Sequence, residues 1–190
     1  MASALPVGAR RLASDVRFSD LIGVTTHAVY RGCVAVVSID GVMVAPERAS
    51  ISVFDRGLLY GDGCFEVLRT WDGVARDIEA HLDRLYETAR FLLLKAIERP
   101  KLTEAIYRTI AAAGVGEQRI RIVLTRGEGP LATRLVELGP GRAIVIVEPL
   151  SPQPTELSLA IVDWPLPKRS DRGHKTLAYV DAVIARELAR

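Results

Sequence analysis

The clearest strand signal in the chain is Gly61-Asp-Gly-Cys-Phe-Glu-Val-Leu-Arg-Thr-Trp71, which joins a glycine-rich turn to an alternating run. Two glycines flank Asp62, and glycine allows a tight backbone path that other residues avoid. Along the run, successive side chains fall on two faces. One face carries Phe65, Val67 and Arg69, and the other carries Cys64, Glu66, Leu68 and Thr70. The stretch therefore predicts a β-strand that starts directly after a bend.

Turn and periodicity signals on either side of this strand predict further elements. Two Asp-Gly pairs, at 40–41 and 72–73, separate apolar runs and predict type I′ hairpins. The other expected strands are Cys33–Ile39, Val42–Val44, Gln118–Thr125, Ala143–Val147 and Leu157–Val162, with a short strand or bend at Ile51–Phe54. The expected helices are Ile78–Leu94 with Asp77 as N-cap, Leu102–Ala113 and Thr176–Arg190.

The order of these elements predicts the fold class and the domains. Strands and helices are mixed without regular β-α-β alternation, which indicates an α+β fold. Pro149, Pro152 and Pro154 mark the best domain boundary. We expect an N-terminal extension over residues 1–34, a small α/β domain over 35–148 and the start of a larger, β-rich domain over 149–190.

Composition excludes several classes of function. The 190 residues are 49% hydrophobic with a net charge of +2, which suits a globular protein and favours neither a nucleic acid nor a membrane as partner. No apolar run reaches the ~18 residues of a membrane span. Two cysteines form no disulfide framework, so we expect a cytoplasmic protein. The histidines and cysteines have no metal-ligand spacing, so we expect no metal site.

Lysine is rare in this chain, and one lysine stands in a suggestive place. Four of the 25 Lys and Arg residues are lysines, and Lys175 lies in Arg172-Gly-His-Lys-Thr-Leu-Ala-Tyr179 before an apolar run. A lysine amine can lose its proton and form an imine with an aldehyde, whereas the guanidinium of arginine stays protonated. Taken alone, Lys175 is better explained as a solvated loop lysine.

A second polar pair falls on the expected helix Ile78–Leu94. His81 and Arg84 are three residues apart, so they are neighbours on one helix face beside the apolar stripe. A planar guanidinium at the edge of a core is suited to gripping a phosphate. The alternative is an ordinary surface arginine paired with Asp83 or Glu87.

Three segments in this order resemble the fold type IV pyridoxal phosphate enzymes, the class IV aminotransferases. They are Asp55-Arg-Gly with Gly61-Asp-Gly-Cys-Phe-Glu66, then His81-x-x-Arg-Leu85, then Lys175-Thr-Leu-Ala-Tyr179. The family includes branched-chain aminotransferases, D-amino acid aminotransferases and aminodeoxychorismate lyases. The resemblance covers about residues 36–190 and implies a D-amino acid aminotransferase-like fold.

The resemblance also implies a cofactor, partners and residue roles. The cofactor would be pyridoxal 5'-phosphate, held by Lys175 as an internal aldimine (a Schiff base), with Arg84 as a phosphate ligand. Tyr179 matches a tyrosine near the cofactor, and Phe65 falls where members place an aromatic residue of the substrate pocket. The implied activity is aminotransfer from an amino acid or amine to a keto acid, in a homodimer.

Two alternatives stay open beside the aminotransferase. Gly63-Cys-Phe65 is similar to aminodeoxychorismate lyases, which eliminate pyruvate on the same scaffold and need no keto acid acceptor. Members of the family continue well beyond their lysine, and this chain has fifteen residues after Lys175. We therefore expect a fragment of a longer enzyme, and a truncated, non-catalytic dimerisation module is the other alternative. After Thr125-Arg-Gly127 the chain lacks the Arg and His with which D-amino acid aminotransferases hold a substrate carboxylate.

Overall fold

The computed structural model describes residues 35–131, 138–152, 156, 159, 161 and 173–189. The chain divides into two compact units, Met1–Cys33 and Val34–Arg190, and the second carries all the described residues. The N-terminal extension and most of the expected strand Leu157–Val162 lie outside the described residues. The expected boundary between residues 148 and 149 stays a prediction.

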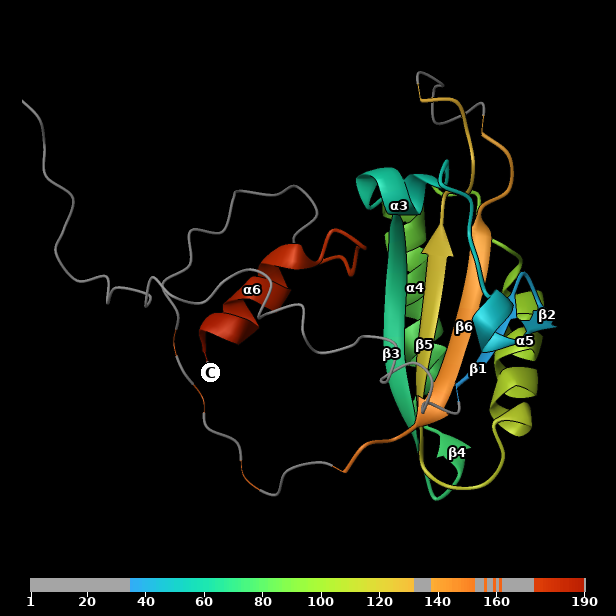
Figure 1. Ribbon diagram of the computed structural model, residues 1–190, viewed down its shortest axis with the longest axis vertical. Helices are drawn as coiled ribbons and strands as arrows, with labels where there is room; N and C mark the ends of the chain where they lie inside the picture. The colour runs from blue at the N-terminus through green and yellow to red at the C-terminus, as the bar shows by residue number, and fades with distance from the viewer. Residues whose placement is uncertain are drawn as a thin grey trace, which may run out of the picture. The chain divides into compact units, whose positions relative to one another are not determined.

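An antiparallel sheet forms the centre of the second unit (Figure 1). Its order is β2-β1-β6-β5-β3-β4. The strands are β1 (Val36–Ile39), β2 (Val42–Val44), β3 (Gly63–Trp71), β4 (Val74–Ala75), β5 (Gln118–Thr125) and β6 (Arg142–Pro149). The long central ladders pair β3 with β5 and β5 with β6, so segments far apart in the sequence form the middle of the sheet.

Both predicted Asp-Gly hairpins are present. Asp40 and Gly41 have φ angles of 53° and 81°, and Asp72 and Gly73 have 51° and 74°. Positive φ at both central residues is the signature of a type I′ turn, whose twist matches the flanking strands. The hairpins join β1 to β2 and β3 to β4.

Two helices, α4 (Ile78–Phe91) and α5 (Arg99–Ala112), cover one face of the sheet (Figure 1). Their apolar side chains form a single buried core with the strands, and we call this side of the sheet the helix face. On β3 the helix face carries Cys64, Glu66, Leu68 and Thr70, and the opposite face carries Phe65, Val67, Arg69 and Trp71. The alternation predicted for this strand is confirmed.

The ends of these helices differ from the predictions. Asp77 precedes α4 but adopts a left-handed conformation, and its side chain forms no capping hydrogen bond. Helix α4 ends at Phe91 instead of Leu94, because Leu93 has a φ of 55° and turns the chain out of the helix. Helix α5 begins three residues early, because Pro100 in its first turn is compatible with a helix start.

The remaining helices are short or shifted. Helix α3 (Arg56–Tyr60) was not predicted, and Ile51–Phe54 forms a turn and no strand before it. A 3₁₀ turn, η1, spans Pro46–Arg48. The expected helix from Thr176 begins later, as α6 (Val180–Leu188). None of the helices in the described part of the chain is long and apolar enough to cross a membrane.

Candidate active site

The segment that carries Lys175 adds to the edge of β3 near the strand's first residues. The Phe65 amide donates to the Lys175 carbonyl at 3.0 Å, and the Leu177 amide donates to the Gly63 carbonyl at 2.9 Å. Thr176 forms an antiparallel bridge with Cys64 between these two bonds. This pairing explains why the helix does not start at Thr176, since the backbone groups there are already used by the strand.

Register then decides where the side chains point. Residues opposite each other in an antiparallel pair share a face of the sheet. Thr176 therefore joins Cys64 on the helix face, where both are buried. Lys175 stands opposite Phe65, on the opposite face.

The Lys175 amine lies against two aromatic rings. Its Nζ is 4.7 Å from the centroid of the Phe65 ring and 5.5 Å from that of Tyr179. The two rings meet edge to face, with centroids 5.1 Å apart. Among the described residues, no carboxylate lies within ion-pairing distance of this amine. The structure thus brings together three of the four residues that the sequence singled out.

Sequence reasoning missed a cation on the same face. Arg121 of β5 pairs with Val67 in the ladder, and its guanidinium lies 4.4 Å from the centroid of the Phe65 ring. Burial lowers the pKa of Arg121, and the nearby charge of Arg119 lowers it further. Among the described residues no carboxylate forms an ion pair with Arg121, although the nearby charge of Glu148 favours its charged form. The alternation of β5 could have placed it on this face, but the register to β3 was needed to place it beside Phe65.

The fourth predicted residue, Arg84, lies on the helix face. It donates from Nε and Nη2 to the two carboxylate oxygens of Glu66, at 2.5 and 2.7 Å. His81 Nδ1 lies 2.8 Å from the same carboxylate. The pairing with Asp83 or Glu87 that we considered is wrong, because Glu66 on the neighbouring strand supplies the acid.

Glu66 is a buried charge that its partners compensate. Burial alone would raise the pKa of its carboxyl, but the hydrogen bonds from Arg84 and His81 outweigh burial and hold that pKa below its usual value. The bond to Glu66 in turn raises the pKa of Arg84. The Glu66 side chain is fully buried, while half of the Arg84 side chain is exposed. Arg84 is therefore fixed along one edge of its guanidinium and accessible along the rest.

The positions of these residues suit pyridoxal phosphate in part. An amine without an acid partner suits the aldehyde of the cofactor, and a half-exposed, fixed guanidinium suits its phosphate. Phe65 and Glu66 are consecutive on β3, so Lys175 and Arg84 lie on opposite faces of this strand. The structure does not bring Arg84 to the face that carries the amine.

The glycines of the turn before β3 are required by the close approach of β5 and of the Lys175 segment. A Cβ on Gly63 would collide with the Leu124 carbonyl oxygen and lie 2.6 Å from Leu177 Cδ1. Gly61 has a φ of 64°, and a Cβ there would lie 3.2 Å from the Ala178 amide nitrogen. The Gly-Asp-Gly motif is therefore explained by close contact with β5 and with the chain after Lys175.

Cys64 lies in the core and not beside the amine. It is fully buried on the helix face, and burial raises the pKa of its thiol to about 12, with Glu66 adding to the effect. Of the tripeptide Gly63-Cys-Phe65, Phe65 alone has its side chain beside the amine. The cysteine of the tripeptide that is similar to lyases thus lies in the core, on the other face of the strand from the amine.

Comparison with known proteins agrees with this geometry. The model of the family described as Amino-transferase class IV matches residues 63–190. A putative branched-chain-amino-acid aminotransferase from Methanocaldococcus jannaschii is 34% identical over 117 residues, which cover 61% of this chain and 41% of that protein. A bifunctional aminodeoxychorismate lyase / D-amino acid transaminase from Mycobacterium tuberculosis is 33% identical over 116 residues, 58% of this chain and 40% of that protein.

Solved structures show the same fold. A branched-chain aminotransferase from Thermoproteus uzoniensis matches with a TM-score of 0.71 at 22% identity, over 82% of this chain and 56% of that one. A hypothetical aminotransferase from Mycobacterium tuberculosis in its PLP-bound form matches with a TM-score of 0.63 at 28% identity, over 82% of this chain and 60% of that one.

These matches settle the family and the fold. The chain spans about two fifths of the length of the two curated relatives described above. The matching structures are fold type IV transaminases, and the mixture of helices with an antiparallel sheet confirms the predicted α+β class. Enzymes of this family depend on pyridoxal phosphate. The chain belongs to the class IV aminotransferase family.

Proposed function

We propose that the protein to which this chain belongs is a pyridoxal phosphate-dependent aminotransferase that moves an amino group from an amino acid or amine to a keto acid. The observation that carries the proposal is the Lys175 amine, which lies against Phe65 and Tyr179 without an acid partner among the described residues. No carboxylate among the described residues occupies this amine, and a lysine amine can form an imine with an aldehyde.

Each residue around the amine has a role in the proposal. Lys175 binds the cofactor through Nζ and moves the proton of the substrate Cα. The bound cofactor supplies an electron-withdrawing ring that stabilises the negative charge left on that carbon. Phe65 and Tyr179 wall the site and exclude water, and Arg84 binds the phosphate through its accessible edge. Arg121 attracts the substrate carboxylate to the face that carries the amine.

We also propose that the protein works as a cytoplasmic homodimer. The support for the dimer is the family to which the chain belongs. Exposed apolar side chains on α6 (Val180, Val183 and Leu188) agree with a chain that continues its packing elsewhere.

The experiment uses the purified full-length protein with pyridoxal phosphate. The visible spectrum should show an absorbance band near the violet, and borohydride reduction should fix the cofactor on the peptide that contains Lys175. Lys175→Met should remove both signals, while Lys101→Met, which alters an exposed lysine of α5, should keep them. A colourless wild-type protein with no labelled Lys175 peptide would refute the proposal and favour a non-catalytic dimerisation module.

The similarity to a bifunctional lyase and transaminase supports a second candidate, pyruvate elimination on the same scaffold. A cosubstrate test separates the two reactions. An aminotransferase stops after one turnover of amino donor unless a keto acid is added, whereas a lyase releases pyruvate repeatedly from aminodeoxychorismate alone. Repeated turnover without a keto acid would replace the aminotransferase with the lyase.

A further inference from the structure

We propose that Arg126 is a positioning residue for Lys175. Arg126 bonds to two structures that support the Lys175 segment. One is the turn before β3, to which the segment is paired, and the other is the end of α4, on which the segment stacks. The proposal rests on the role of Lys175 given above, and it concerns how the amine is held in place before any ligand binds.

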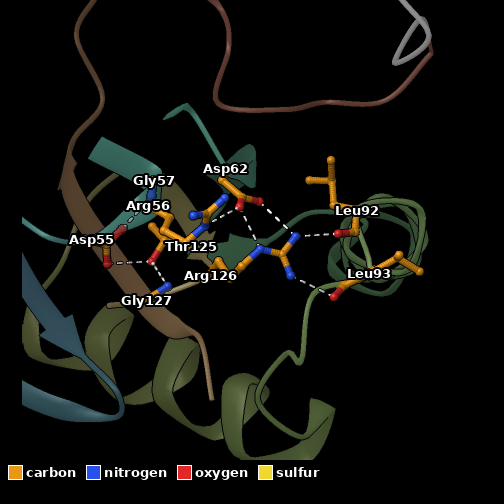
Figure 2. Close-up of polar contacts among 9 residues, drawn as sticks. All are labelled: Asp55, Arg56, Gly57, Asp62, Leu92, Leu93, Thr125, Arg126 and Gly127. Carbon is orange, nitrogen blue, oxygen red and sulfur yellow. Dashed lines mark hydrogen bonds and ion pairs between the residues drawn. The ribbon is translucent and has the colours of Figure 1, made fainter. Parts of the chain in front are cut away.

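Arg126 is a buried hub of hydrogen bonds (Figure 2). Its Nε and Nη2 donate to the Asp62 carboxylate at 2.7 and 2.9 Å. Its Nη1 donates to the Leu93 carbonyl at 2.9 Å, and Nη2 also donates to the Leu92 carbonyl at 2.5 Å. All three guanidinium nitrogens are therefore used, in a planar fork that a lysine could not reproduce.

The first of these partners controls the turn that holds the Lys175 segment. Asp62 stands between Gly61 and Gly63, and the Arg126 amide also donates to the Asp62 carbonyl at 3.1 Å. The Gly63 carbonyl accepts the Leu177 amide, so the backbone bond two residues beyond the reactive lysine depends on this turn. A shift of the turn would move the pairing partner of the Lys175 segment directly.

The second set of partners fixes the end of α4. The carbonyls of Leu92 and Leu93 follow Phe91, the last residue of the helix. The Phe91 ring stacks on His174, with centroids 4.0 Å apart and an angle of 12° between the planes. His174 directly precedes Lys175, so the segment is supported on both sides of the lysine by groups that meet at Arg126.

The backbone around Arg126 is also tied down (Figure 2). Buried Asp55 accepts from the Gly57 amide at 2.7 Å and from Thr125 Oγ1 at 2.8 Å. Thr125 Oγ1 in turn accepts from the Gly127 amide at 3.1 Å. The residues before and after Arg126 are thus fixed to the turn that begins α3, so the guanidinium has a rigid base. This arrangement accounts for the Thr125-Arg-Gly127 motif without giving it contact with a ligand.

The first test needs no cofactor and measures amide hydrogen exchange in the full-length protein. We compare wild type with Arg126→Lys and with Arg99→Lys, a control that also removes a guanidinium with several partners, here Glu79 and Asp83 at the exposed surface. Arg126→Lys should speed exchange of the Leu177 and Phe65 amides by about tenfold or more. In the wild type, local opening has to break the hydrogen bonds of Arg126, and the variant lacks them. The Val145 amide in the central sheet should keep its wild-type rate, and Arg99→Lys should change none of the three.

Two results would overturn the proposal. One is wild-type exchange at Leu177 and Phe65 in folded Arg126→Lys. The other is faster exchange by the same factor at Leu177, Phe65 and Val145, which would show that Arg126 serves overall stability alone. If Arg126→Lys does not fold, Asp62→Asn decides by the same comparison, because it keeps the shape of the turn and removes the charge that Arg126 binds. Asp62 also pairs with Arg56 Nε at 3.1 Å, so Arg56→Lys is measured beside it and should leave the Leu177 and Phe65 amides at their wild-type rates.

The second test measures the consequence for the amine. Arg126→Lys should weaken binding of pyridoxal phosphate by about tenfold and lower kcat more than it changes KM, because a displaced amine reacts slowly with a substrate that still binds. Unchanged cofactor affinity and kcat in a variant with faster exchange at Leu177 would contradict positioning. If wild-type protein binds no cofactor, the proposed function fails, while the exchange measurement still decides whether Arg126 holds the segment.

Discussion

The two faces of β3 are built from alternate residues of one strand, yet they have opposite physical characters. On the helix face, the polar groups are paired: Glu66 with Arg84 and His81, and Thr70 with Glu117 and the Gln118 amide. On the opposite face, the ends of the Lys175 and Arg121 side chains lie on the Phe65 ring, and among the described residues neither forms an ion pair with a carboxylate.

The two faces therefore differ in whether their charged side chains are bonded to other side chains. A buried charge is tolerated when hydrogen bonds compensate it, as they do for the carboxylate of Glu66. Cations without a bonded carboxylate are found where a ligand supplies the missing charge. The comparison therefore gives the helix face a mainly structural character, except for the exposed edge of Arg84, and gives the opposite face the side chains proposed to react.

The largest effect should separate the faces by stability. Leu68→Ala on the helix face should lower the free energy of unfolding by about 2–5 kcal/mol, because it leaves a cavity in the closed core. Val67→Ala, one residue earlier on the opposite face and half-buried, should cost about 1 kcal/mol. Urea unfolding followed by circular dichroism measures both. Equal losses would show that the opposite face is packed as tightly as the core.

The next effect should separate the faces by ligand binding. Arg121→Gln removes the cation beside Phe65 and should raise KM for the amino donor about 10- to 100-fold, which corresponds to the loss of one charged hydrogen bond. Arg119→Gln is the matched control, because it lies on the same face of β5 but pairs with Glu148. Steady-state kinetics with the full-length enzyme measures both variants. The assignment would fail if the control raised KM as much as Arg121→Gln does.

A smaller effect concerns the compensated charge on the helix face. The pKa of the Glu66 carboxyl is lowered in the folded protein. As the pH falls, the carboxyl therefore takes up its proton first in the unfolded chain, at a pH of about 4.3. The stability that Glu66 contributes is present above that pH and is lost as the pH falls through the lower pKa of the folded state. Glu66→Gln should cost about 1–2 kcal/mol at pH 7, with half-exposed Arg84 limiting the loss.

The pH dependence of unfolding checks this assignment. From pH 5 down to pH 3 the free energy of unfolding should fall less steeply in Glu66→Gln than in wild type. Thr109→Val is a suitable control, because it removes buried hydrogen bonds on the same side of the sheet to Ser38 Oγ and the Ala105 carbonyl, neither of which titrates. Parallel pH profiles for wild type and Glu66→Gln would mean that folding does not lower the pKa of Glu66.

The sequence predicted those features whose causes are local. The alternation of Cys64 to Trp71 and the two Asp-Gly hairpins follow from residues next to one another, and the structure confirms both. The start of the last helix was wrong, because pairing of Thr176 with Cys64, more than a hundred residues away, overrides its helical pattern. Helix ends shifted for a similar reason, since the left-handed Leu93 is part of a turn that Arg126 holds from a distant strand.

The same limit applies to the candidate site. Lys175, Phe65 and Tyr179 were singled out by motif, and the structure brings them together. Arg121 was missed because its position beside Phe65 depends on the register between β5 and β3. Neither the sequence of β5 nor any motif gives that register. Glu66 was not foreseen as the acid partner of Arg84 for the same reason, since it is eighteen residues away and comes near only when α4 packs on β3.

The smallest expected effect concerns thiol labelling: Cys64 should not react with a thiol reagent in the native protein. This measurement tests directly whether the helix face is closed to solvent. With Cys33→Ser, Cys64 is the single thiol in the chain. Because burial raises the pKa of this thiol to about 12, roughly one molecule in ten thousand carries the reactive thiolate at pH 8. A chromogenic disulfide reagent should therefore leave native protein unlabelled and label about one thiol per chain after unfolding in guanidinium. Rapid labelling of the native protein would place the thiol within reach of solvent, and the helix face would then be open where the comparison requires it to be closed.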